Sequence, residues 1–174
     1  MLDRILYRTR QFWFALTAAP AHDNLEQARL LLTEEQFALF QALPPGEQAH
    51  GLEVYRQLQA SGETHPDLLR AALLHDIGKG QAPLRVWERI AIVLARAAFP
   101  EKVREWGRGP AAGWRRPFVV AEQHPQWGAE LAAQTGASPL TVALIRRHQE
   151  PFTSQPVSME EQLLGQLQTA DDHS

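Results

Sequence analysis

The chain has 174 residues, of which 44% are hydrophobic and 21% charged, and its formal net charge is −3. These values suit one globular domain with a substantial core, and they exclude a disordered chain. The negative balance argues against general nucleic-acid binding. The sequence has no cysteine, which excludes disulfides and thiolate-bound zinc, so any metal would have to be held by histidine and carboxylate.

The first segment predicts an amphipathic helix. Apolar side chains recur there at helical spacing, with arginines between them: Leu2, Ile5, Leu6, Phe12, Trp13 and Leu16. Its apolar run from Phe12 to Ala19 is too short to cross a bilayer, which takes about 20 residues. We expect residues 1–32 to form this helix and a linker, docked on the domain or, alternatively, in contact with a membrane surface or a partner. We expect no membrane span and a cytoplasmic location.

The next segments carry clear helix-start signals. Thr33 to Gln36 form a capping box that opens a helix ending near Leu43. A second helix is predicted over residues 47–60, and a third opens around Pro66 and ends at Gly78.

The second half of the chain is also predicted to be mostly helical. Residues 83–99 form a helix with apolar residues too dense on all sides for full exposure. Two further helices start at Ser138 and Ser158. Because no alternating strand pattern appears, we predict an all-α, single-domain helical bundle without internal repeats.

One stretch, residues 106–117, does not resemble a helix. It contains three glycines, two prolines and three arginines, which predicts a mobile surface loop. Its arginines and a neighbour are candidates for holding a phosphate or carboxylate: Arg104, Arg108, Arg115 and Arg116. A simple solvated loop is the alternative.

Helical spacing indicates which histidines face inward. His50, His75 and His148 each share a helical stripe with apolar residues, whereas His124 precedes Pro125 at an expected helix boundary. The other histidines lie between expected helices or near the C-terminus and look ordinary: His22, His65 and His173.

The last helix offers two neighbouring aspartates, and the pattern distinguishes them. Asp171 follows Leu164 and Leu167 on an apolar face, whereas Asp172 lies on a polar one. Asp171 is therefore predicted to face inward. A buried, unpaired carboxylate is costly, so it needs a cation.

Four histidines and two aspartates from five segments predict a metal site with nitrogen and oxygen ligands. Such ligands suit iron, manganese or other divalent first-row metals, and they are too numerous for a structural zinc site. Two metals bridged by one carboxylate would use all six.

The segment LLHDIGKG resembles the signature of the HD superfamily of metal-dependent phosphohydrolases, in its HDIG form. The similarity extends over about residues 48–172, and the order of ligands resembles the two-metal branch: His50, His75, Asp76, His124, His148 and Asp171. It implies an HD-type helical domain, here placed at residues 33–174.

The resemblance also implies roles for individual residues. His50, His75, Asp76 and Asp171 would hold one metal, and Asp76 would bridge to a second metal held by His124 and His148. Lys79 matches a lysine that in related proteins lies near the substrate phosphate, with a solvated lysine as the alternative.

The family pattern limits the substrate. In the cyclic-di-GMP phosphodiesterase branch, a second histidine follows the one matching His148, and a Gly-Tyr-Pro motif comes soon after. Here Gln149 follows and the motif is missing, so this specificity is not expected. The dinucleoside-polyphosphate hydrolase branch, which lacks the motif too, remains open.

The predicted function is a metal-dependent phosphohydrolase that cleaves a phosphoester or phosphoanhydride of a small nucleotide-like substrate through metal-activated hydroxide. Two divalent ions are expected, with iron or manganese favoured and cobalt, nickel, zinc and magnesium compatible. Asp76 and Lys79 are the predicted catalytic residues, and substrate contacts are predicted at Lys79, Arg108, Arg115 and Arg116. A silent metal-binding signalling or sensor module and a helical interaction module are the alternatives; the exact substrate and the oligomeric state stay open.

Overall fold

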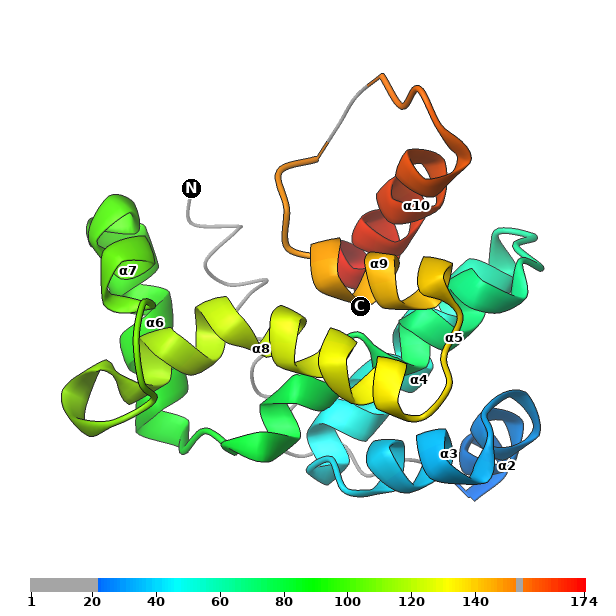
Figure 1. Ribbon diagram of the computed structural model, residues 1–174, viewed down its shortest axis with the longest axis horizontal. Helices are drawn as coiled ribbons and strands as arrows, with labels where there is room; N and C mark the ends of the chain where they lie inside the picture. Colours follow the sequence, from blue (N-terminus) through cyan, green and yellow to red (C-terminus); the bar gives the residue numbers. More distant parts are fainter. Residues whose placement is uncertain (1–21, 153–154) are drawn as a thin grey trace.

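The computed structural model of the protein describes residues 22–152 and 155–174 (Figure 1). Every regular element in this part of the chain is helical, which confirms the all-α prediction. The α-helices, with two short 3₁₀ helices among them, are α2 (His22–Leu31), α3 (Glu34–Gln41), α4 (Pro45–Ala60), α5 (Pro66–Leu74), η1 (Ile77–Gln81), α6 (Val86–Ala98), α7 (Pro100–Trp106), η2 (Gly113–Arg115), α8 (Arg116–Gln134), α9 (Pro139–Arg147) and α10 (Met159–His173). None of the helices in these residues is long and apolar enough to cross a membrane.

The predicted helix starts are built as their sequences indicate. The hydroxyl of Thr33 accepts a hydrogen bond from the amide of Gln36, whose side chain accepts one in return from the amide of Thr33. The hydroxyls of Ser138 and Ser158 cap α9 and α10 by accepting hydrogen bonds from the amides of Thr141 and Glu161. These caps satisfy amides that have no partner within their helices.

Two predicted boundaries around the HD doublet are wrong. The third helix, α5, ends at Leu74, because the chain tightens into η1 instead of continuing to Gly78. The segment around His124 is not a helix boundary, since α8 runs unbroken through Pro125. Both differences place the doublet at a junction where η1 packs on α8.

Gly78 is the point of closest approach in that junction. A Cβ atom at this position would lie 2.0 Å from the backbone oxygen of His124 and 2.7 Å from the nitrogen of Gly128. Gly78 is therefore needed for close packing of η1 on α8 and not as a helix stop.

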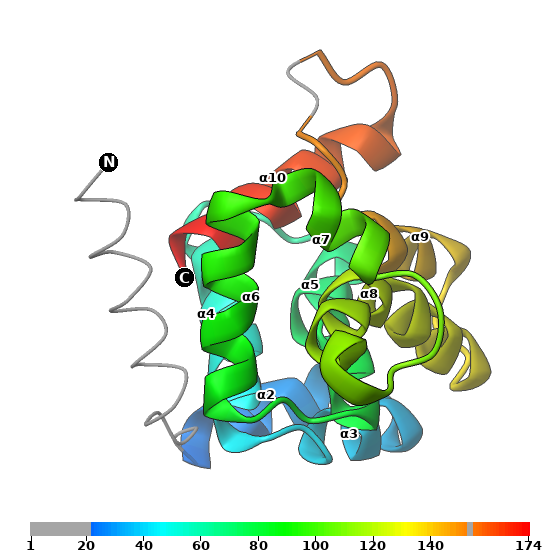
Figure 2. The same cartoon turned by 90° about the vertical axis from the view of Figure 1, so that its left-hand side faces the viewer.

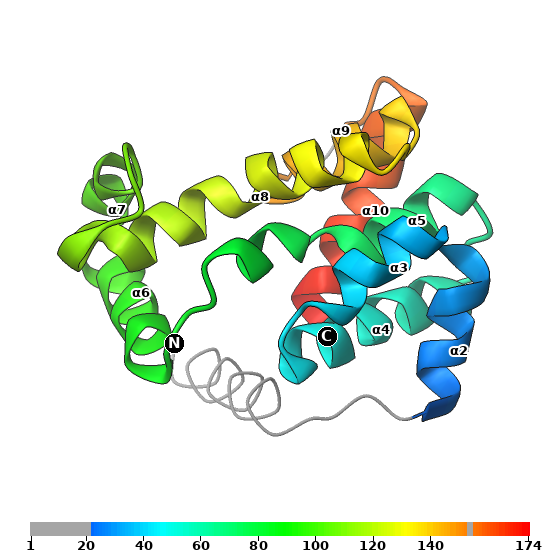
Figure 3. The same cartoon turned by 60° about the horizontal axis from the view of Figure 1, so that its bottom comes forward.

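The main core lies among α4, α5, α9 and α10, which gather on one side of the molecule (Figures 1 and 3). Its fully buried residues include Leu68, Leu74 and Leu144. Ala28 and Leu32, from α2 and the turn after it, belong to the same core, so the packed unit begins within the segment expected to be a linker. The predicted N-terminal amphipathic helix lies outside the described residues.

A second, smaller core joins α6 and α7 to the first half of α8. It consists of Ile92, Val103, Phe118 and Ala121, with Leu84, Ala95 and Trp106 packed around them. Figure 1 shows α6 and α7 on the opposite side from the main core, with the long α8 crossing between the two.

Helix α6 is not fully exposed, as its apolar density predicted, but it is covered on one side only. Glu88 and Ile92 are its buried residues, whereas Trp87 is 56% exposed and Leu94 is 64% exposed. Helix α6 contacts α7 and α8 along one side and leaves an apolar side in solvent.

The glycine-rich stretch is only partly irregular. Trp106 ends α7, Gly113 begins the turn η2, and Arg116 begins α8, which leaves residues 107–112 without regular structure.

Candidate metal centre

Helices α5 and α9 are built to the same plan. Each is nine residues long, has proline at its start and has a histidine as its C-cap, His75 in α5 and His148 in α9. Their starts are joined by Asp67, whose Oδ1 accepts hydrogen bonds from the hydroxyls of Ser138 at 2.7 Å and Thr141 at 3.0 Å. Because two joined helices of equal length end at the same level, the capping rings lie together, with centroids 5.1 Å apart.

Three of the histidines are oriented by the backbone of their own helices. Nδ1 of His75 donates to the carbonyl of Ala72 at 2.9 Å, that of His124 to Val120 at 3.0 Å, and that of His148 to Ile145 at 2.7 Å. A carbonyl oxygen can only accept, so the proton lies on Nδ1 and Nε2 is turned toward the site.

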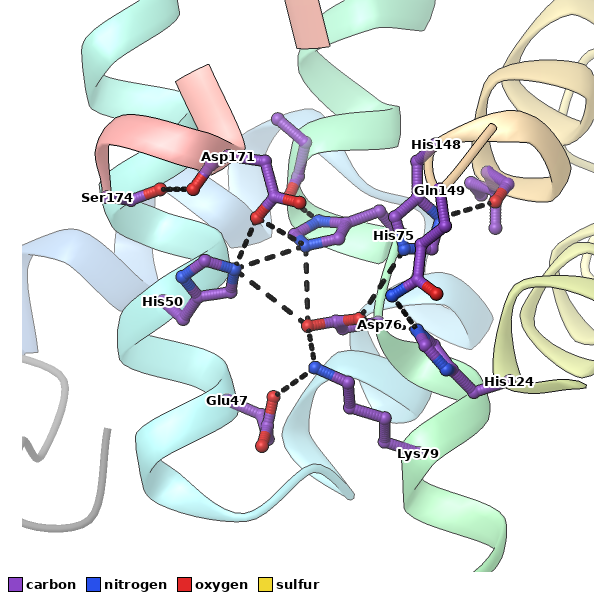
Figure 4. Close-up of polar contacts among 12 residues, drawn as sticks. Glu47, His50, His75, Asp76, Lys79, His124, His148, Gln149, Asp171 and Ser174 are labelled. Carbon is purple, nitrogen blue, oxygen red and sulfur yellow. Dashed lines mark hydrogen bonds and ion pairs between the residues drawn. The ribbon is translucent and has the colours of Figure 1, made fainter. Parts of the chain in front are cut away.

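Asp76 lies between two groups of ligands (Figure 4). Its Oδ1 is 3.2 Å from Nε2 of His124 and 3.8 Å from Nε2 of His148. Its Oδ2 is 3.4 Å from Nε2 of His75 and 3.9 Å from Nε2 of His50. One carboxylate thus presents a separate oxygen to each side, the arrangement a bridging ligand requires.

Asp171 completes the first group from the last turns of α10. Its Oδ1 lies 2.8 Å from Nε2 of His50 and 3.6 Å from Nε2 of His75. Two sets of donor atoms result, each within 4.8 Å of one another: His50, His75 and Asp171 in one, and Asp76, His124 and His148 in the other. The structure therefore brings together all six residues that the sequence singled out.

A buried carboxylate that was not predicted from the sequence lies beside this centre. Glu47 is 3% exposed and its Oε2 accepts from the ammonium of Lys79 at 3.1 Å, while Nη2 of Arg89 lies 2.6 Å from Oε1. The ammonium of Lys79 also lies 2.5 Å from Oδ2 of Asp76. Glu47 precedes His50 by three residues and so shares its helix face, which is the signal that could have identified it.

Charge rather than burial controls the ionisation of the central carboxylates. Burial alone would raise the pKa of Asp76, but Lys79 and His75 outweigh it and hold this pKa well below its usual range. Burial likewise opposes the charge of Asp171, and His75 and His50 lower its pKa strongly. Both groups are therefore carboxylates, the form that binds a cation.

The two capping histidines differ in their ionisation. Burial works against a charge on His75, but the carboxylates of Asp76 and Asp171 outweigh it and raise its pKa well above the usual value. For His148, burial and the neighbouring His75 and His124 act together and lower the pKa to about 3. His148 is neutral at pH 7, with a free electron pair on Nε2.

The donor atoms of the site suit divalent cations. Nε2 of His148 is buried and has no hydrogen-bond partner among the described residues, which is unfavourable unless a cation occupies the position it faces. Imidazole and carboxylate donors without thiolate are the ligands that first-row divalent metals take.

A polar cleft of about 670 Å³ opens beside the centre, between α6, α7, α8, α9 and α10. The ligands His148 and Asp171 form part of its wall. Three arginines from three helices also line it: Arg96, Arg104 and Arg146. Gln149, whose amide nitrogen lies 3.3 Å from Nε2 of His124, stands where the cleft meets the second ligand group.

The arginines predicted from the 106–117 stretch lie elsewhere. Arg116 is held by Glu88 at 2.5 Å and by the carbonyl of Pro83 at 2.9 Å, and Arg115 lies over the ring of Trp114. Arg108 is exposed. None of the three lines the cleft, whereas Arg104, also singled out, does. Lys79 does not line it either.

The fold and the centre define an all-helical protein with a histidine–aspartate site suited to metal. A family model described as HD domain matches residues 47–173, and the chain belongs to that family. This confirms the resemblance and the HD-type bundle. A search of curated proteins and a search of solved structures each found no match.

Proposed function

We propose that the protein is a two-metal phosphohydrolase acting on a small nucleotide-like phosphoester or phosphoanhydride. The observation that carries the proposal is the position of Asp76, with Oδ1 directed at His124 and His148 and Oδ2 at His75 and His50. A site for one metal would not need the two oxygens of Asp76 to face different pairs of histidines. Membership of the HD family supports the same reaction class.

The residues of the chain would divide the work as follows. One cation would be held by His50, His75, Asp76 and Asp171. The other would be held by Asp76, His124 and His148. When bound, such a pair of cations activates a water for attack on phosphorus and neutralises charge on the leaving oxygen. The arginines of the cleft would hold the rest of an anionic substrate, with guanidinium forks suited to phosphate oxygens.

The test is hydrolysis of a phosphoester panel with iron, manganese, cobalt or magnesium supplied in turn. The panel contains nucleoside monophosphates, cyclic nucleotides and dinucleoside polyphosphates. We expect Asp76→Ala to lose both metals and at least about 10³-fold in kcat/KM, because removal of the bridge disrupts both ligand groups. Near wild-type activity in Asp76→Ala would contradict the two-metal mechanism.

Two neighbouring aspartates provide a matched control. Asp171→Asn removes a ligand of the first group and is expected to lower the bound metal and the rate together. Asp172→Asn alters an adjacent carboxylate in the same cleft wall and is expected to retain both metals. Metal bound by the wild type through these ligands, with no turnover of any substrate, would instead favour a metal-binding sensor module.

A further inference from the structure

Helix α6 carries an apolar stripe on its outer side. Its members recur at helical spacing and, for the large ones, are 45–64% exposed: Val86, Trp87, Ile90, Val93, Leu94 and Ala97. The opposite side of α6 holds Glu88, Ile92 and Ala95, which pack toward the small core. Figure 2 shows α6 at the front of the molecule. A continuous stripe of this kind indicates a surface that another element covers.

We propose that residues 1–16 of the same chain cover this stripe as an amphipathic helix. The sequence places Leu2, Ile5, Leu6, Phe12, Trp13 and Leu16 on one helical face, and on the other face Arg4, Arg8 and Gln11. Both stripes are apolar, and each extends over about three helical turns or more. Pro20 separates the segment from α2, so the segment can turn independently of that helix.

The length of the segment suits this occupant. The described chain begins at His22, at the start of α2, which packs against α3, α4 and α5 and lies away from α6 (Figures 1 and 3). A helix of about 20 residues reaches about 30 Å, the diameter of a small domain. Residues 1–16 would thus lie along α6, and residues 17–21, which extend over up to about 17 Å, would join them to α2 within the same chain.

Docking would also act on the site through the inner side of α6. Arg89 on this helix pairs with Glu47, which holds Lys79 beside Asp76, and Arg96 lines the polar cleft. The helix itself is held by only a small core. Covering its outer side would fix the positions of both arginines.

Disulfide trapping in the full-length chain tests the contact directly, because the sequence has no cysteine of its own. Phe12→Cys is combined in turn with Trp87→Cys, Ile90→Cys and Leu94→Cys, and each double variant is oxidised in dilute solution. Two controls match them. Phe12→Cys with Leu30→Cys places the second thiol on an exposed apolar position of α2, and Gln11→Cys with Ile90→Cys uses the polar face of the segment.

The expected result is an intramolecular disulfide in at least one α6 pair, at about tenfold the yield of both controls, because docking raises the effective concentration of the two thiols. Covalent dimers in place of internal links would assign the stripe to a second copy and overturn the proposal. Equal disulfide yields in the α6 pairs and the controls would also overturn the proposal, since they would indicate that residues 1–16 do not dock on α6.

Hydrogen exchange provides an independent readout that needs no introduced thiol. In the full-length double variant Leu6→Glu with Trp13→Glu, the amides of α6 are expected to exchange about tenfold faster, while those of α4 and α5 keep their wild-type rates. Unchanged exchange in α6, together with wild-type binding to vesicles of phosphatidylcholine and phosphatidylglycerol that the variant loses, would assign the segment to a membrane surface and overturn the proposal.

Discussion

The ammonium of Lys79 lies 2.5 Å from Oδ2 of Asp76, the oxygen that also faces His75 and His50. In the metal-free protein, Lys79 thus supplies positive charge at the oxygen directed to the first ligand group. The carboxylates of Asp76 and Glu47 outweigh the effect of burial and raise the pKa of Lys79, so it stays charged.

Replacing Lys79 is therefore expected to affect stability in a metal-dependent way. In metal-free Lys79→Met, two buried carboxylates lose their nearest cation, which should lower the free energy of unfolding by about 3 kcal/mol. Added Mn²⁺ should restore part of this loss by binding the native state. Urea denaturation with and without Mn²⁺ measures both effects, and Lys102→Met, at an exposed position of α7, is the control. A loss that is the same with and without the metal would contradict this role.

Metal binding is expected to release a proton from His75. Its raised pKa means that the metal-free native state carries this proton at pH 7, and a ligand nitrogen must give it up. Affinity for Mn²⁺ should therefore rise with pH, by up to about tenfold per pH unit, until the pH passes the raised pKa. Calorimetry in buffers of different ionisation enthalpy counts the protons, and a count of zero at pH 7 would contradict the prediction.

The same shift gives the metal-free protein a pH dependence of stability. The charged His75 stabilises the native state fully below about pH 6.5, the unfolded value, and this contribution is lost as the pH rises through the raised native pKa. His148 acts at the other end, since its native pKa of about 3 lies below the unfolded value and stability falls as the pH drops from about 6.5. The urea midpoint of the metal-free protein should therefore fall as the pH rises through the native pKa of His75. The contribution of His148 should also fall as the pH drops below about 6.5.

Two sets of arginines make different predictions for substrate binding. Replacing Arg96 or Arg146 by alanine, both in the cleft, is expected to raise KM about tenfold for a nucleoside polyphosphate and to change it little for a small phosphomonoester. Alanine at Arg108 or Arg115, outside the cleft, should leave KM for both substrates unchanged. Steady-state kinetics on the two substrates distinguishes the two sets. An increase in KM confined to the Arg108 and Arg115 variants would indicate that the substrate binds at residues 106–117 and not in the cleft.

Gly78 and Gly80 form a matched pair for packing of the centre. Gly78→Ala would drive a Cβ into the backbone of α8 and is expected to lower the free energy of unfolding by at least about 2 kcal/mol and to weaken metal binding. At Gly80 a Cβ would meet only a methyl group of Leu43, at 3.6 Å, so Gly80→Ala should change stability by less than about 0.5 kcal/mol. Equal stability of the two variants would contradict the close approach of η1 and α8.

The sequence predicted the features that depend on local chemistry. Helix caps such as Thr33 are local, and so is the helical spacing that selects Asp171 over Asp172 as a member of a ligand group. The all-α fold and the HD family follow from such features together with the HDIG motif. They do not require knowledge of how the helices are arranged in space.

Features that depend on contacts between distant segments were missed. Glu47 resembles an ordinary acid in the first turn of a helix until Lys79 and Arg89 arrive from other elements. Helix α5 ends at Leu74 because Gly78 packs against α8. The residues around Leu74 contain no local sequence signal for this contact. The apolar density of α6 predicted that the helix is partly covered, but the side that its neighbours cover depends on contacts with α7 and α8.

The hydrogen bonds from Nδ1 of His75, His124 and His148 to the carbonyls of Ala72, Val120 and Ile145 lie entirely within each histidine's own helix. The donor atoms are thus set by the scaffold before any ion arrives. A chelator should accordingly remove bound metal without unfolding the helices, and added metal should bind again. Different metals can then be loaded into one protein preparation and their effects compared on the same fold.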